Sequence, residues 1–204
     1  MAFEPKNYDR LIGTPGFSDT MMKNHFTLYQ GYVTNTNKIA DALSEMAKAG
    51  KFGTPEYNEL KRRFGWEFNG VRLHELYFDN MSRTPKALEK SEIPSESEGT
   101  KNQLATKITE QFGGWADWEK DFKATGTMRG IGWTILYHDL VANRLFNTWI
   151  TEHDIGHLAG CKPILVLDVF EHAYTLDYGL KRADYIEAFM KSVDWQLVAG
   201  RFQK

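Results

Sequence analysis

The first half of the chain has apolar residues at helical spacing. Between Asp19 and about Ala49, apolar side chains recur every three, four or seven positions, as on the inner face of an amphipathic helix. Gly50 and Gly53 follow and predict its end. A second pattern of this kind predicts a helix from Pro55 to about Met81. Two long helices with a short turn between them predict an antiparallel helical hairpin.

The second half mixes two periodicities. Residues 103 to 125 have a helical pattern, and helical spacing returns from about Phe170 to the end. Between these stretches lie three short strand-like runs bounded by turn residues, at 132–137, 144–150 and 163–167. Strands flanked by grouped helices predict the α+β class. We therefore expect an N-terminal α-helical hairpin and a C-terminal α/β domain with a small, three-stranded antiparallel sheet.

A polar segment separates the two halves. Residues 84 to 102 are rich in Ser and Glu and include Pro85 and Pro94, a composition typical of a connection rather than of a packed element. This predicts an N-terminal domain at residues 1–90, a linker at 91–102 and a C-terminal domain at 103–204.

Composition narrows the class of protein. No apolar run approaches the roughly 18 residues that a membrane helix needs, and the first residues lack a secretory signal pattern. Cys161 is the single cysteine, so there is no internal disulfide framework. The formal net charge is −2, with no basic stripe. We expect a cytoplasmic protein that binds neither membranes nor nucleic acid.

Histidines are the main candidate chemistry. His25 shares a predicted helix face with Met22 and Tyr29, and His74 lies on the inner face of the second helix. His172 stands four residues after Asp168, which follows the apolar run ILVL. A buried imidazole without a partner costs on the order of a few kcal/mol. These groups must therefore form a polar network or share a cation.

The ligand types limit which cation this is. Neutral imidazole and carboxylate suit manganese, iron, zinc or copper, and spacing alone does not choose among them. Because Cys161 is alone, a thiolate-rich structural zinc site or an iron–sulfur cluster is disfavoured.

Several segments resemble the iron and manganese superoxide dismutases. Residues 168–174 read DVFEHAY, close to that family's closing motif Asp-x-Trp-Glu-His-Ala-Tyr, and DYIEAF follows at 184–189. The segments HFTLYQGYVTN, HELYF and RGIGWTIL resemble the family's first-helix, second-helix and Gly-x-Gly-Trp stretches. The resemblance covers nearly the whole chain and is weakest in residues 1–20 and in the linker.

The resemblance implies a metalloenzyme that disproportionates superoxide, an antioxidant oxidoreductase. It implies one iron or manganese ion per subunit, with a solvent molecule as fifth ligand and four protein ligands: His25, His74, Asp168 and His172. It further implies Tyr32 as the gateway residue, Trp133 on the wall of the site, and His153 as the hydrogen-bond partner of the metal-bound solvent. Glu171 would reach the partner subunit's His172, which implies a homodimer, with a tetramer as the larger alternative.

The chain departs from the family pattern near the gateway. Residues 28–31 read LYQG where most members have a second histidine, and the spacing from His25 to Tyr32 is one residue shorter. Either the helix is locally irregular or its register is shifted, since Asn24 stands at the usual spacing. Thr175 replaces a second tyrosine. We predict that Tyr29 rebuilds the gateway.

Other departures concern the metal and the remaining histidines. In the family, a glutamine that bonds the metal-bound solvent can come from the second helix, but that position is Gly70 here, which leaves His153 in this role. Gly70 resembles manganese-type members, whereas a histidine at the position of His153 resembles iron-using and metal-tolerant members. Phe78 and Phe170 stand where tryptophan is common. His138 and His157 have no family role and are expected to be surface or structural residues. Two alternatives remain: a zinc-dependent hydrolase and a catalytically inactive metal-binding relative.

Overall fold

The computed structural model describes residues 2–86 and 103–203. The predicted linker at 91–102 lies outside the described residues, and the predicted domain boundaries remain predictions. Within the described residues, no helix is both long enough and apolar enough to cross a membrane.

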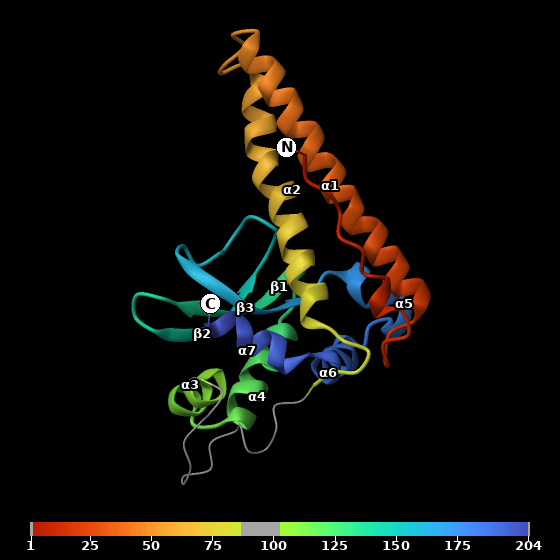
Figure 1. The fold of residues 1–204 in the computed structure, drawn as a ribbon, viewed down its shortest axis with the longest axis vertical. Helices are drawn as coiled ribbons and strands as arrows, with labels where there is room; N and C mark the ends of the chain where they lie inside the picture. The colour runs from red at the N-terminus through yellow and green to blue at the C-terminus, as the bar shows by residue number, and fades with distance from the viewer. Residues whose placement is uncertain (1, 87–102, 204) are drawn as a thin grey trace.

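Two long helices form the N-terminal hairpin. Helix α1 spans Asp19–Lys48 and α2 spans Pro55–Asn80; the two lie side by side and extend away from the rest of the molecule (Figure 1). The Ser18 and Thr54 side chains cap their N-termini by accepting backbone N–H groups. The turn between them uses two glycines at positive φ, and the predicted helices are confirmed to within one residue at each end.

The predicted helix at 103–125 is instead two helices. Helix α3 covers Gln103–Phe112 and α4 covers Trp115–Gly126. The break falls at Gly113 and Gly114, and Gly113 has a φ of 83°, which ends the helical path. The helical pattern predicted for residues 103 to 125 is confirmed, but two adjacent glycines divide it into two helices.

The sheet has three antiparallel strands, as predicted, in the order β2-β1-β3. Strand β1 is Trp133–Asp139, β2 is Arg144–Ile150 and β3 is Cys161–Asp168. Asn143 takes a φ of 49° in the turn before β2. On the central strand, Trp133 lies directly opposite Asp168. This register places an indole beside a carboxylate at the end of the sheet.

Short helical pieces complete the chain. After β3 come η2 (Glu171–Ala173), α5 (Thr175–Tyr178), α6 (Arg182–Ser192) and α7 (Trp195–Gln203). Helix α2 packs against β3, and α1 contacts η2. The lower part of α2, coloured yellow, therefore lies against β3, and the lower, red part of α1 lies against the segment that follows β3 (Figure 1). One buried apolar cluster runs through both halves.

Candidate metal centre

Four side chains from four separate elements converge where α1, α2 and β3 meet. Oδ2 of Asp168 lies 3.2 Å from Nε2 of His25, 3.2 Å from Nε2 of His172 and 3.6 Å from Nε2 of His74. The four candidate ligand atoms lie within 4.8 Å of one another. Asn24 is exposed, and α1 is an unbroken helix, so the structure places His25 rather than Asn24 in this group.

The hydrogen bonds around His74 point to a cation. Its Nδ1 lies 2.6 Å from the carbonyl oxygen of Gly70, which only accepts, so Nδ1 carries the proton. Nε2 of the neutral ring is then a bare lone pair, and it faces the Asp168 carboxylate, another acceptor. This nitrogen is fully buried and has no hydrogen-bond partner among residues 2–86 and 103–203. Two acceptors facing each other in the interior need a positive ion between them.

Protonation states fit the same conclusion. Burial lowers the pKa of His25 and lowers that of His74 well below its usual range, so both rings are neutral at pH 7. Burial alone would raise the pKa of the Asp168 carboxyl, but His172 and His25 beside it hold that pKa well below its ordinary value. Neutral imidazoles and an ionised carboxylate are the forms that bind a divalent ion.

A second set of bonds fixes the carboxylate. The Phe170 N–H donates to Oδ1 of Asp168 at 2.8 Å, which leaves Oδ2 for the three imidazoles. The Tyr185 hydroxyl donates to the Asp168 carbonyl at 2.7 Å and lies 3.1 Å from the Tyr77 hydroxyl. The role of Tyr185 was missed from sequence, although it lies in the DYIEAF run; its spacing gives no sign of a partner 17 residues away.

His153 links two other predicted site residues. Trp133 Nε1–H donates to Nδ1 of His153 at 3.0 Å, and Nε2 of His153 lies 2.9 Å from the Tyr32 hydroxyl. An indole can only donate, so Nδ1 of the histidine is an acceptor and the ring proton sits on Nε2. Burial lowers the pKa of His153 to about 4, so the ring is neutral at pH 7. The Tyr32 oxygen therefore accepts from His153, and its own hydrogen is free to donate elsewhere.

Gly70 makes room for the gateway residue. A Cβ atom at this position would meet the Tyr32 ring at 2.6 Å, closer than any real contact. The space that a glutamine from α2 would use is therefore filled by Tyr32. Tyr32 therefore packs its ring against Gly70 and bonds His153 through its hydroxyl.

Aromatic rings enclose the centre. Phe78 lies against His25 with 4.9 Å between ring centroids, and Phe170 lies at 4.9 Å from His153 and 5.5 Å from His172. Trp133 contacts His74 edge-on at 5.0 Å. The side chains of three ligands are almost fully buried, whereas that of His172 is 30% exposed. The group is therefore surrounded by aromatic rings, and His172 is its one partly exposed member.

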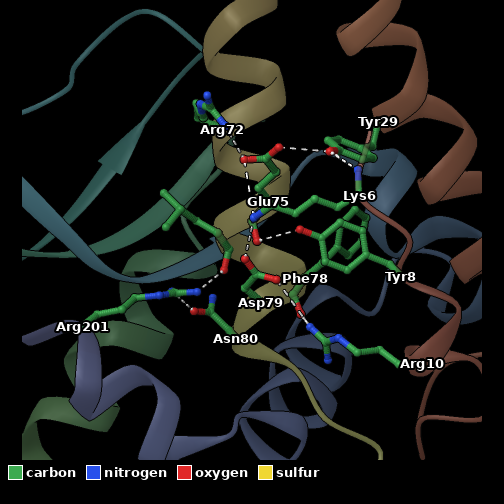
Figure 2. Close-up of polar contacts among 11 residues, drawn as sticks. Lys6, Tyr8, Arg10, Tyr29, Arg72, Glu75, Phe78, Asp79, Asn80 and Arg201 are labelled. Atoms are coloured by element: carbon green, nitrogen blue, oxygen red, sulfur yellow. Dashed lines mark hydrogen bonds and ion pairs between the residues drawn. The ribbon is translucent and has the colours of Figure 1, made fainter. Parts of the chain in front are cut away.

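Tyr29 does not take the gateway position that we predicted. It is fully buried, and its hydroxyl donates to Oε1 of Glu75 at 3.1 Å while accepting the Lys6 N–H at 3.0 Å (Figure 2). Glu75 also receives Arg72 at 2.7 Å (Figure 2). The Tyr29 hydroxyl on α1 therefore bonds to α2 through Glu75 and to the N-terminal segment through Lys6. The prediction was wrong because Glu75 offers this hydroxyl a buried acceptor.

The partly exposed side of the centre carries Glu171 and Thr175. Both are exposed, and the Thr175 hydroxyl donates to the Glu171 carbonyl at 2.8 Å. Glu171 therefore lies on the surface next to the partly exposed His172. His138 is buried and bonds Asn143 at 3.0 Å, whereas His157 is on the surface. Neither ring belongs to the group of four.

Comparisons with known proteins agree with this geometry. The sequence pattern of the iron/manganese superoxide dismutase C-terminal domain matches residues 100–201. A superoxide dismutase [Mn] 2 of Haloferax volcanii is 35% identical over 201 residues, covering 98% of this chain and 93% of the relative. A superoxide dismutase [Fe] of Aquifex pyrophilus is 36% identical over 206 residues, covering 98% and 91%. Similar relatives thus include both manganese and iron enzymes.

Proposed function

Because this chain belongs to the iron/manganese superoxide dismutase family, we infer that it disproportionates superoxide to dioxygen and hydrogen peroxide at one iron or manganese ion per subunit. The observation that carries this inference is the buried Nε2 of His74, which faces the Asp168 carboxylate among three imidazoles and has no hydrogen-bond partner in the described part of the chain. His25, His74, Asp168 and His172 would hold the ion. When bound, such an ion supplies the alternation between two oxidation states that the reaction requires.

The charge of the ligand set suits an anionic substrate. Three neutral imidazoles and one carboxylate carry a charge of −1, so a divalent ion leaves the centre positive. The surrounding aromatic rings exclude water and strengthen this field. A small anion such as superoxide fits a site surrounded by aromatic rings, whereas a hydrolase would need an open pocket for a larger substrate.

Tyr32, His153 and Trp133 would control protons. Peroxide leaves after taking two protons, and burial raises the pKa of Tyr32, so this hydroxyl keeps its proton at pH 7. Trp133 fixes the tautomer of His153, and His153 fixes the oxygen of Tyr32. The free hydroxyl hydrogen of Tyr32 can then donate toward an anion or an ordered water. The expected bond from His153 to metal-bound solvent would need this same Nε2–H, so it would replace the contact with Tyr32 rather than add to it.

Glu171 would complete the centre in a homodimer. The exposed carboxylate next to the partly exposed His172 supports a contact with the partner subunit's His172, whose second ring nitrogen needs an acceptor. Such an interface would also cover the exposed part of His172.

The test combines elemental analysis with turnover. Protein purified without added metal is analysed for iron, manganese and zinc, and superoxide decay is then measured after reconstitution with each ion. We expect turnover with iron or manganese and its loss in His74→Gln, while His138→Gln, a buried histidine elsewhere, keeps it. Tight binding of zinc with hydrolytic activity, or of any metal with no superoxide turnover, would overturn the proposal.

A further inference from the structure

Strand β1 offers two side chains to the segment that carries His153. Trp133 and Tyr137 are four residues apart, so the two-residue period of a strand directs them to the same face. Trp133 reaches the His153 ring, and the Tyr137 hydroxyl lies 2.7 Å from Nδ1 of His157. Both contacts fall on residues 153–157, which follow β2 and form neither helix nor strand.

His157 joins Tyr137 to the backbone of His153. Its Nε2 lies 2.7 Å from the carbonyl oxygen of His153, which only accepts, so Nε2 carries the proton and donates it. Nδ1 of the neutral ring then accepts from the Tyr137 hydroxyl. Tyr137 is 2% exposed, and a buried phenol needs such a partner. The His157 side chain is on the surface, so these two bonds rather than packing orient its ring.

Side chains of strand β1 thus hold both the ring and the backbone carbonyl of His153. Its ring is held through Trp133, and its carbonyl through His157 and Tyr137. The turn in between contains Gly156 at a φ of 95°, a backbone angle that glycine adopts without strain. A displacement of the His153 backbone by a fraction of an ångström would lengthen the 2.9 Å contact with Tyr32.

We propose that Tyr137 and His157 are positioning residues, which hold the His153 ring in line between Trp133 and Tyr32. Neither touches the four metal ligands in the group described above. A surface cavity of about 190 Å³ borders both residues, and Tyr137 belongs to the buried core, so Tyr137→Phe is chosen because it removes the hydroxyl and keeps the ring. The structural claim concerns the His153 ring itself, and its effect on turnover rests on the proposed function.

The test uses three variants of the full chain. His157→Leu removes both bonds, Tyr137→Phe removes only the hydroxyl, and His157→Gln keeps one donor for the His153 carbonyl and one acceptor for Tyr137. His138→Gln is the control, because His138 is the neighbour of Tyr137 on β1 and bonds Asn143 instead. The chain is loaded with Zn²⁺, a diamagnetic ion, and nitrogen-15 NMR reports the tautomer of the His153 ring. Turnover is measured separately on protein loaded with manganese or iron.

We expect His157→Leu and Tyr137→Phe to move the His153 ring from the single Nε2–H form toward a mixture. We also expect kcat to fall at least threefold at equal metal content, with KM changed less, and His157→Gln to restore both readouts. Unchanged His153 signals in His157→Leu, or a His157→Gln variant as impaired as His157→Leu, would overturn the positioning role. If the NMR changes occur but the parent chain has no turnover, the positioning role stands and the proposed function fails.

Discussion

The Tyr29 hydroxyl lies 3.1 Å from Oε1 of Glu75 and ties α1 to α2 beside the metal centre. Tyr29 is one helical turn after His25, and Glu75 directly follows His74. The same hydroxyl accepts the Lys6 N–H, so the N-terminal segment is held at this point as well (Figure 2). One phenol therefore sets the spacing of two helices that each contribute a proposed metal ligand.

Removal of this hydroxyl should destabilise the fold. Tyr29→Phe leaves the buried Glu75 oxygen and the Lys6 N–H without a partner, and such losses cost about 1–3 kcal/mol. Urea unfolding at pH 7 measures the change in the free energy of unfolding. Tyr57→Phe, near the far end of the hairpin, is the control and should change it by less than about 0.5 kcal/mol. Equal effects of the two variants would contradict the role of Tyr29.

The same residue predicts a loss of stability in alkali. Burial raises the pKa of Tyr29 to about 12, above the value of about 10 in an unfolded chain. Between these two values the unfolded state releases a proton that the folded state keeps, so the free energy of unfolding falls as pH rises. The contribution is fully present below pH 10. Thermal unfolding measured from pH 9 to 12 should show that the melting temperature falls less steeply with pH in Tyr29→Phe than in the parent chain. If the melting temperatures of the two proteins fall in parallel, Tyr29 is not the cause of the loss.

The sequence predicted elements better than side-chain partners. The apolar spacing in α1 and α2 survives in the structure because each helix buries one continuous face, and Asn143 marked a turn because few residues tolerate its backbone angle. The helical pattern at 103–125 was also confirmed, but the break at two adjacent glycines was not predicted. Periodicity measures which face is buried and says little about a local break.

Partners far apart in sequence were harder to predict. Tyr29 was expected at the gateway because it stands near the missing histidine, but its direction depends on Glu75, 46 residues away. The group of four was predictable, since burial of three imidazoles requires partners and the resemblance named the residues. The pair of Tyr137 and His157 carried no signal, because their contact depends on the path of a turn that local sequence does not specify.

Metal binding should stabilise the folded chain. An ion that binds only the folded state adds about 2.7 kcal/mol at a free concentration 100 times its dissociation constant. Manganese added to metal-free protein should therefore raise the melting temperature, and His74→Gln should lose most of this shift. His138→Gln, buried but outside the group of four, should keep it. A full shift in His74→Gln would remove this residue from the ligand set.

Tyr32→Phe should separate proton supply from metal binding. The substitution removes the hydroxyl that lies 2.9 Å from His153 but leaves the aromatic ring against Gly70 and the four ligands in place. Metal content should be unchanged, while kcat should fall by about tenfold or more, since a positioned proton donor is lost. Stopped-flow measurement of superoxide decay at high substrate concentration checks this. An unchanged kcat would show that water alone supplies the protons.

The exposed carboxylate of Glu171 gives the sharpest test of assembly. Next to it, the His172 side chain is 30% exposed, although the other three proposed ligands are almost fully buried. If Glu171 bonds the partner subunit's His172, Glu171→Ala breaks two equivalent contacts in the dimer. Loss of one partner of a buried charged pair costs about 2 kcal/mol or more, so the two losses together cost about 4 kcal/mol and the dimer dissociation constant should rise by roughly a thousandfold.

Sedimentation velocity across a dilution series measures this constant, and elemental analysis of the same samples measures metal retention. Glu110→Ala, an exposed glutamate on α3, is the matched control and should behave as the parent chain. We expect dissociation and metal loss to appear together in Glu171→Ala, because the second nitrogen of His172 would lose its acceptor. A variant that remains dimeric with full metal and full turnover would show that Glu171 forms no bridge, and that the exposed part of His172 is covered in another way.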